Sequence, residues 1–237
     1  LNDIDGDSIC DENEIAGCTD EEANNYNPEA TDDDDSCEYS STVDFDIELN
    51  GGANLISFWA LPEDVSVANI MSSLGTNATG VIGQGVAASQ IGPNMWVGSL
   101  SSISRTSGYW VKLDNSGLLS LTEATPTEST TIFDLNSGAN LISFPYEGSS
   151  SITDAIPDAA EAEFNGIIGQ GVAASQIGPN MWVGSLNQLE GTKGYWAKVN
   201  SGVSFSFNEP IGSMRSTESA YSSTYELTYN FTFFSTF

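Results

Sequence analysis

The chain of 237 residues contains no histidine, only five lysine and arginine residues, and no apolar run long enough to cross a membrane. The lack of histidine excludes imidazole-ligated zinc and the common Ser-His and Cys-His nucleophile pairs. Five basic residues stand against 33 acidic ones, whereas phosphate binding needs clustered lysine and arginine. We therefore expect neither a nucleic acid partner nor a membrane span.

Cysteine is also scarce, and Cys10, Cys18 and Cys37 all lie in the acidic N-terminal stretch. This placement is typical of a small, core-poor segment that is cross-linked in an oxidising compartment. We therefore expect an extracellular or cell-surface protein. The sequence shows no initiator methionine and no signal peptide, so we expect Leu1 to follow processing or the chain to be a fragment.

The most informative feature is a repeat, because IGQGVAASQIGPNMWVGSL fills residues 82–100 and again residues 168–186. The offset of 86 also relates the two copies of GANLISF and of GYW, which indicates a tandem duplication without a gap. We therefore expect an acidic arm, two modules, and a linker with a terminal strand, at residues 1–41, 42–127, 128–208 and 209–237.

The acidic stretch begins with a candidate calcium loop. Calcium needs six to eight hard oxygen ligands, and alternate residues of a tight loop converge on one centre. The twelve positions from Asp3 supply five carboxylates and one backbone carbonyl at the required spacing: Asp3, Asp5, Asp7, Ile9, Asp11 and Glu14. Ser8 replaces the glycine of an EF-hand and no helix precedes the loop, so the motif resembles the calcium loops of thrombospondin type 3 repeats. The alternative is an acidic linker.

The rest of the arm reads GCTD, then NYNPEAT, then DDSC. It resembles a short GCTD…NYNP…DDGSC module of large secreted proteins from marine bacteria. Many copies of that module carry a further cysteine at the position of Asn24, so the resemblance implies a Cys18–Cys37 disulfide. Cys10 is then free or paired with an upstream or separate chain. A second calcium ion is a further hypothesis, against plain solvated charge, with the ligands Asp20, Asn25, Asn27, Asp32 and Asp34.

The sequence of each module predicts a small antiparallel or mixed sheet with one helix, so we expect the fold class to be α+β or mainly β. Alternation or apolar runs predict strands in both copies, at residues 43–49, 54–58, 95–100 and 108–113 and at their counterparts near 132–135, 140–144, 181–186 and 194–199. Apolar residues at helical spacing predict a helix before Gly75, and a shorter one that is broken near Pro157. Trp110 and Trp196 lie in apparent core strands, so we expect them to pack inside.

The module motifs GANLISF, GVIGQGVAAS, WVGSL and GYW resemble a tandem domain of surface and secreted proteins of marine bacteria. That family has mostly no assigned function, so the resemblance implies no reaction and no catalytic residues. Two explanations remain for the identity of residues 82–100 and 168–186: the fold requires it, or the two segments meet or form equivalent binding surfaces. Trp96 and Trp182 are a candidate ligand surface for stacking on a sugar, against the alternative of core packing.

The C-terminal residues 225–233 alternate strictly between apolar and polar side chains. Such a strand must pair with a sheet edge, either in its own chain or in a neighbouring copy. Addition to a neighbour builds an open polymer. The candidate assembly strand presents one apolar face: Tyr225, Leu227, Tyr229, Phe231 and Phe233.

The leading hypothesis is a secreted, calcium-binding structural or adhesive protein, such as a filament subunit that self-associates. The alternative is a carbohydrate-binding module of a larger secreted protein, with a glycan as partner. An enzyme is not expected, because the two copies share only the acidic pairs Glu48/Asp134 and Glu123/Glu209 in equivalent positions and both pairs flank strands.

Overall fold

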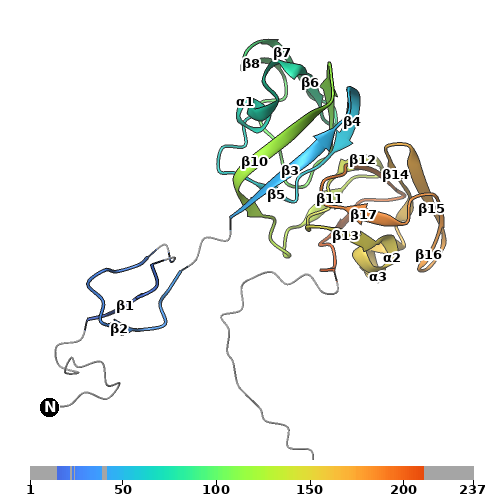
Figure 1. Cartoon of the computed structure of the whole chain (residues 1–237). Coiled ribbons are helices and arrows are strands. Elements are labelled where there is room, and N and C mark those ends of the chain that lie inside the picture. The colour runs from blue at the N-terminus through green and yellow to red at the C-terminus, as the bar shows by residue number, and fades with distance from the viewer. Residues whose placement is uncertain (1–14, 22, 24, 39–41, 211–237) are drawn as a thin grey trace, which may run out of the picture.

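The computed structural model describes residues 15–21, 23, 25–38 and 42–210 (Figure 1). The described chain is mostly β, with 48% strand and 9% helix, which confirms the mainly β alternative. The arm contains only two short strands, which pair in parallel: β1 (Ala16–Gly17) and β2 (Asp32–Asp33). Two compact bodies follow the arm, and each corresponds to one copy of the repeat.

Module 1 consists of eight strands and two short helical segments. In chain order these are β3 (Val43–Leu49), β4 (Gly52–Ile56), β5 (Ala60–Leu61), α1 (Val67–Ile70), the 3-10 helix η2 (Ser72–Asn77), β6 (Ala78–Ile82), β7 (Ala87–Gly92), β8 (Met95–Gly98), β9 (Tyr109–Leu113) and β10 (Gly117–Pro126). One antiparallel sheet has the order β4-β9-β6-β7-β8, and a second has the order β3-β10-β5.

Module 2 repeats this plan. Its elements are β11 (Phe133–Leu135), β12 (Gly138–Ile142), β13 (Ser149–Ser151), α2 (Ile152–Ala155), α3 (Asp158–Glu161), β14 (Phe164–Gly169), β15 (Val172–Gly178), β16 (Met181–Gly184), β17 (Gln188–Glu190), β18 (Tyr195–Val199) and β19 (Val203–Phe205). The five-stranded sheet β12-β18-β14-β15-β16 has the same order as its counterpart, and β11-β19 and β13-β17 are separate pairs.

Each module has its own hydrophobic core. In module 1, apolar residues of β3 and β10 pack against those of β6, β9 and α1, and in module 2 the corresponding cluster is rich in phenylalanine. The rings of Phe133, Phe144, Phe205 and Phe207 lie within 6.0 Å of one another in successive pairs, mostly edge to face. Two separate cores mean that each body buries its apolar surface largely by itself.

The helices are shorter than the sequence predicts. Ser66 caps α1 by accepting the backbone N–H of Asn69, but the helix ends after one turn and continues as the 3-10 segment. Gly75, predicted as the stop, lies within that segment with φ 55° and ψ −129°. In module 2 the predicted break near Pro157 is confirmed, because Pro157 separates α2 from α3.

The expectation that Trp110 and Trp196 pack inside is wrong. Strand β9 alternates, so that Tyr109, Val111 and Leu113 are buried while Trp110 is partly exposed, and β18 repeats this pattern. Trp110 lies opposite Ile82 in the ladder, on the outer face of the sheet. A strand has two faces, and the smaller residues of β9 occupy the inner one.

Candidate functional site

The two modules lie side by side (Figure 1), and their contacts are reciprocal. Isolated antiparallel bridges join Ile56 to Lys193 and Ile142 to Ser107. Both partners of the second bridge are offset by 86 residues from those of the first, so this contact is made twice. The same relation generates the isologous interface of a two-fold dimer, here within a single chain.

A glutamine side chain from each identical segment forms hydrogen bonds with the edge strand of the other module's five-stranded sheet. The Gln84 amide accepts a hydrogen bond from the backbone N–H of Leu141 at 2.8 Å and donates one to the carbonyl of Ala139 at 3.1 Å. Gln170 does the same toward Leu55 and Ala53, at 2.8 and 3.0 Å. A primary amide carries one acceptor and one donor side, so it can replace a neighbouring peptide group. One N–H and one carbonyl on the outer edge of each of β12 and β4 are thereby paired.

The second part of the contact is close backbone packing at the glycine of each GYW motif. Gly108 donates its N–H to the carbonyl of Leu141, and Gly194 donates to that of Leu55, at 3.2 Å in both cases. A Cβ on Gly108 would lie 2.8 Å from the carbonyl oxygen of Ile142, and one on Gly194 would lie 2.6 Å from that of Ile56. These positions therefore require glycine because a neighbouring backbone lies against them.

Two serines of the GANLISF motif complete the contact between the modules. The hydroxyl of Ser57 donates to the carbonyl of Lys193 at 2.6 Å, and that of Ser143 donates to the carbonyl of Arg105 at 2.5 Å. Both serines have no exposed surface, so their hydroxyl groups need these partners. The GANLISF, identical-segment and GYW motifs therefore all contribute residues to one interface.

The identical segments also present apolar surface to solvent. In module 1, Ile82, Ile91, Met95 and Val97 are 43–63% exposed, and their counterparts in module 2 are 43–60% exposed: Ile168, Ile177, Met181 and Val183. No charged residue occurs in either identical segment, although the chain carries a net charge of −28. An exposed apolar patch on a monomer marks an interaction surface.

Trp96 and Trp182 lie on the inner side of this surface. Both are partly exposed, and both pack against the core of their module. The indole of Trp182 donates at 2.6 Å to the carboxylate of Glu161, which also accepts the backbone N–H of Asn180 at 2.8 Å. Glu161 is 3% exposed, and Gly75 occupies the equivalent position in module 1. The buried Trp96 Nε1 has no hydrogen-bond partner among the described residues.

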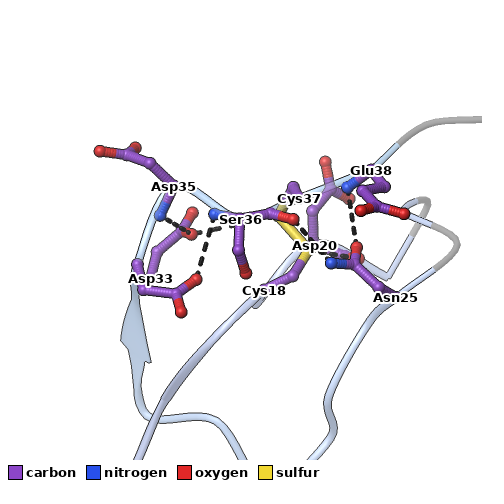
Figure 2. The surroundings of a disulfide bond; sticks show 9 residues. Cys18, Asp20, Asn25, Asp33, Asp35, Ser36, Cys37 and Glu38 are labelled. Carbon is purple, nitrogen blue, oxygen red and sulfur yellow. Dashed lines mark hydrogen bonds between the residues drawn. A yellow bond between two sulfur atoms is a disulfide. The ribbon is translucent and has the colours of Figure 1, made fainter.

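The predicted disulfide of the arm is confirmed, because Cys18 and Cys37 are bonded with an S–S distance of 2.06 Å (Figure 2). The side chain of Asn25 forms hydrogen bonds with the backbone of both neighbours of Cys37. It donates to the carbonyl of Ser36 at 2.6 Å and accepts the backbone N–H of Glu38 at 2.7 Å. The disulfide and this amide together hold the second half of the arm against its first half.

The predicted metal ligands fall into two groups. Asp3, Asp5, Asp7, Ile9, Asp11, Glu14 and Cys10 lie outside the described residues, as do Tyr225, Leu227, Tyr229, Phe231 and Phe233 of the candidate assembly strand. Within the described part of the arm, no three acidic or cysteine side chains form a group that could hold a metal ion. The side-chain oxygens of Asn27 and Asp34 accept backbone N–H groups of Glu29 and Ser36. The geometry therefore gives no support to the second calcium ion, which stays a prediction.

Two buried tyrosines hold the loops that precede β9 and β18. The Tyr109 hydroxyl accepts the N–H of Ser104 at 2.7 Å, and the Tyr195 hydroxyl accepts that of Glu190 at 2.8 Å. Burial raises the pKa of both phenols, although these hydrogen bonds act in the opposite direction. Tyr195 also lines a cleft of ≈ 360 Å³ between the modules, together with Gln170, Lys193 and Glu48.

Comparison of the chain with protein-family models, with curated protein sequences and with solved structures finds no match. Within the described residues, no helix is long and apolar enough to cross a membrane. The class of the protein therefore rests on its own structure: a mainly β chain of two pseudo-symmetric modules behind a disulfide-bonded acidic arm.

Sequence reasoning missed the roles of Gln84, Gln170 and Glu161. The identity of the two segments was a usable signal for the glutamines, since a residue fixed by a reciprocal contact must match in both copies. No such signal existed for Glu161, because the other copy has glycine there.

Proposed function

We propose that the protein is a secreted structural or adhesive subunit that self-associates outside the cell and binds calcium in its acidic arm. The observation that carries this proposal is the uncharged apolar surface that occurs twice, once in each identical segment. A chain of net charge −28 repels its own copies at long range, so lasting contact between copies needs a surface without charge. The identical segments supply such a surface.

The arm supports an extracellular location. Its Cys18–Cys37 disulfide closes a segment in which Cys18 and Ala23 are buried core residues, so little apolar burial is available to hold it together. Disulfides of this kind persist in oxidising compartments. In the proposal, calcium binds the carboxylates of the loop from Asp3 to Glu14 and supplies the attraction that keeps these like charges close together.

Electron microscopy of negatively stained protein tests the assembly. We expect extended multimers in calcium and shorter or dispersed particles after chelation. Dispersed monomers under every calcium and protein concentration would contradict self-association. Calorimetric titration tests calcium separately: Asp5→Asn with Asp7→Asn should abolish binding at the first loop, whereas the control Asp44→Asn should leave it unchanged. Unchanged binding in both variants would place calcium elsewhere.

A carbohydrate-binding module is the second candidate, favoured by the partly exposed rings of Trp96, Trp110 and their counterparts Trp182 and Trp196. Aromatic rings that face solvent offer a flat apolar surface to a sugar ring. A glycan array with the unmodified protein tests this candidate, with Trp110→Ala and Trp196→Ala as variants because neither ring belongs to a core cluster. A bound glycan whose affinity does not depend on these rings would exclude them as the site.

A further inference from the structure

Each five-stranded sheet has two edge strands, and the contacts of these two strands differ. The edges at β4 and β12 are closed by the glutamine amides and by the bridges to the other module. The opposite edges are β8 and β16, which pair only with β7 and β15 in the described part of the chain. An edge strand presents backbone N–H and C=O groups that can pair with an added strand.

The strands β8 and β16 and the segments around them in sequence carry no exposed charge that would discourage strand addition, and the Glu161 carboxylate that contacts Trp182 of β16 is buried. Sheet edges are commonly blunted by charged residues, but residues 65–104 and 164–189 contain no charged side chain. Met95 and Val97 on β8 are 58% and 49% exposed, and Met181 and Val183 on β16 are 55% and 49% exposed. An added strand would therefore meet both open backbone groups and apolar side chains.

The chain itself contains a segment that matches this edge. Residues 225–233 alternate between apolar and polar side chains, and the charged residues beyond Pro210 are Arg215, Glu218 and Glu226. The described chain ends beside α2, where Asn208 donates its N–H to the carbonyl of Ala155. The stretch from Pro210 to Tyr225 can extend over about 50 Å at roughly 3.3 Å per residue. The segment can therefore reach beyond the module from which it emerges.

We propose that residues 225–233 of one copy add as a strand to the β8 or β16 edge of a second copy. The apolar face of the added strand, which includes Leu227 and Phe231, covers the exposed side chains of the acceptor, as in other strand-addition complexes. This inference rests on the proposed self-association and names the contact that produces it. Because the donor and acceptor surfaces differ, the contact is head to tail and can continue from one copy to the next.

The test uses two full-length variants with complementary defects. Leu227→Asp with Phe231→Asp removes the donor face, and Val97→Asp with Val183→Asp places a charge on both acceptor edges. Sedimentation velocity should show multimers for the unmodified protein and a single 25.1 kDa species for each variant alone. An equimolar mixture should form complexes of two or three copies and nothing larger, because the donor-defective variant retains two acceptor edges and the acceptor-defective variant retains one donor strand.

Two controls add the same charge elsewhere: Thr228→Asp on the polar side of the donor, and Leu118→Asp at an apolar position that is 46% exposed on β10. Both should assemble as the unmodified protein does. Multimers in all variants would overturn the inference and leave self-association to another contact. A monomeric unmodified protein would contradict the proposed function itself. A mixture that stays monomeric would overturn the inference, because the retained donor and the retained acceptor edges would then not be complementary.

Discussion

Gln84 and Leu141 lie in different modules, yet the Gln84 side chain accepts the backbone N–H of Leu141 at 2.8 Å, as a neighbouring strand would. The reciprocal pair, Gln170 and Leu55, has the same distance. A side-chain amide therefore ends each sheet at the point where the two modules meet. The backbone N–H and carbonyl groups of Leu55 and Leu141 are paired across the interface without a continuous sheet.

Removing these amides should weaken the contact between the modules. Gln84→Ala removes the side-chain partner of the part-buried Leu141 N–H and of the exposed Ala139 carbonyl, and we expect a loss of about 0.5–1.5 kcal/mol in the free energy of unfolding. Gln170→Ala should cost a similar amount because its contacts are equivalent. Urea unfolding of the full chain measures both. Gln90→Ala is the control, since the Gln90 amide donates to the carbonyl of Gly75 within one module, and an equal loss there would contradict the assignment.

The glycines of the GYW motifs should not tolerate a methyl group. Gly108→Ala and Gly194→Ala would bring a Cβ within 2.8 Å of a backbone oxygen of the other module, so one backbone must move away. We expect a loss of at least about 1–3 kcal/mol, as for other overpacked positions. Gly51→Ala is the matched control, because its Cβ would meet its nearest atoms at 3.4 Å. Thermal unfolding compares the three, and a control as damaging as Gly108→Ala would exclude the steric explanation.

The buried carboxylate of Glu161 should matter for module 2. Glu161→Ala leaves the indole N–H of Trp182 and the backbone N–H of Asn180 unpaired, at an expected cost of about 1–3 kcal/mol. Glu161→Gln retains one acceptor oxygen and should cost less. Urea unfolding measures the loss. Equal stability of the alanine and glutamine variants would show that packing, rather than hydrogen bonding, decides the effect.

Stability should fall in alkaline solution because of Tyr109 and Tyr195. Burial raises the pKa of both phenols in the folded state above the ordinary value of about 10. The unfolded chain therefore loses these protons first. The contribution of the two protonated phenols to the free energy of unfolding is complete below about pH 10. It declines as the pH rises from the pKa of the unfolded chain toward that of the folded chain.

Urea midpoints at pH 8 and pH 11 measure this decline. Tyr109→Phe with Tyr195→Phe should reduce stability at pH 8, because Ser104 and Glu190 lose their acceptors, and should make the decline smaller. The same decline in the double variant would assign it to other groups.

Much of the fold could be predicted because alternation and apolar runs report which face of a strand is buried. The strands at β3, β4, β8 and β9 follow that signal directly, and the Pro157 break follows from the ring of proline. The same alternation places Trp110 outside, yet the size of its ring argued for the core. The pairing order of the strands, the docking of the modules and the role of Gln84 depend on tertiary contacts that no local pattern encodes.

The reciprocal contact between the modules limits the number of modules that can meet at this surface to two. Each module covers the edge strand β4 or β12 of the other with its glutamine. Both edges are then occupied, so a third module cannot bind at the same surface. A module cut out and expressed alone would lose the cap on its β4 or β12 edge. It should recover that cap by dimerising with an identical module, with the covalent link of the native chain replaced by mass action.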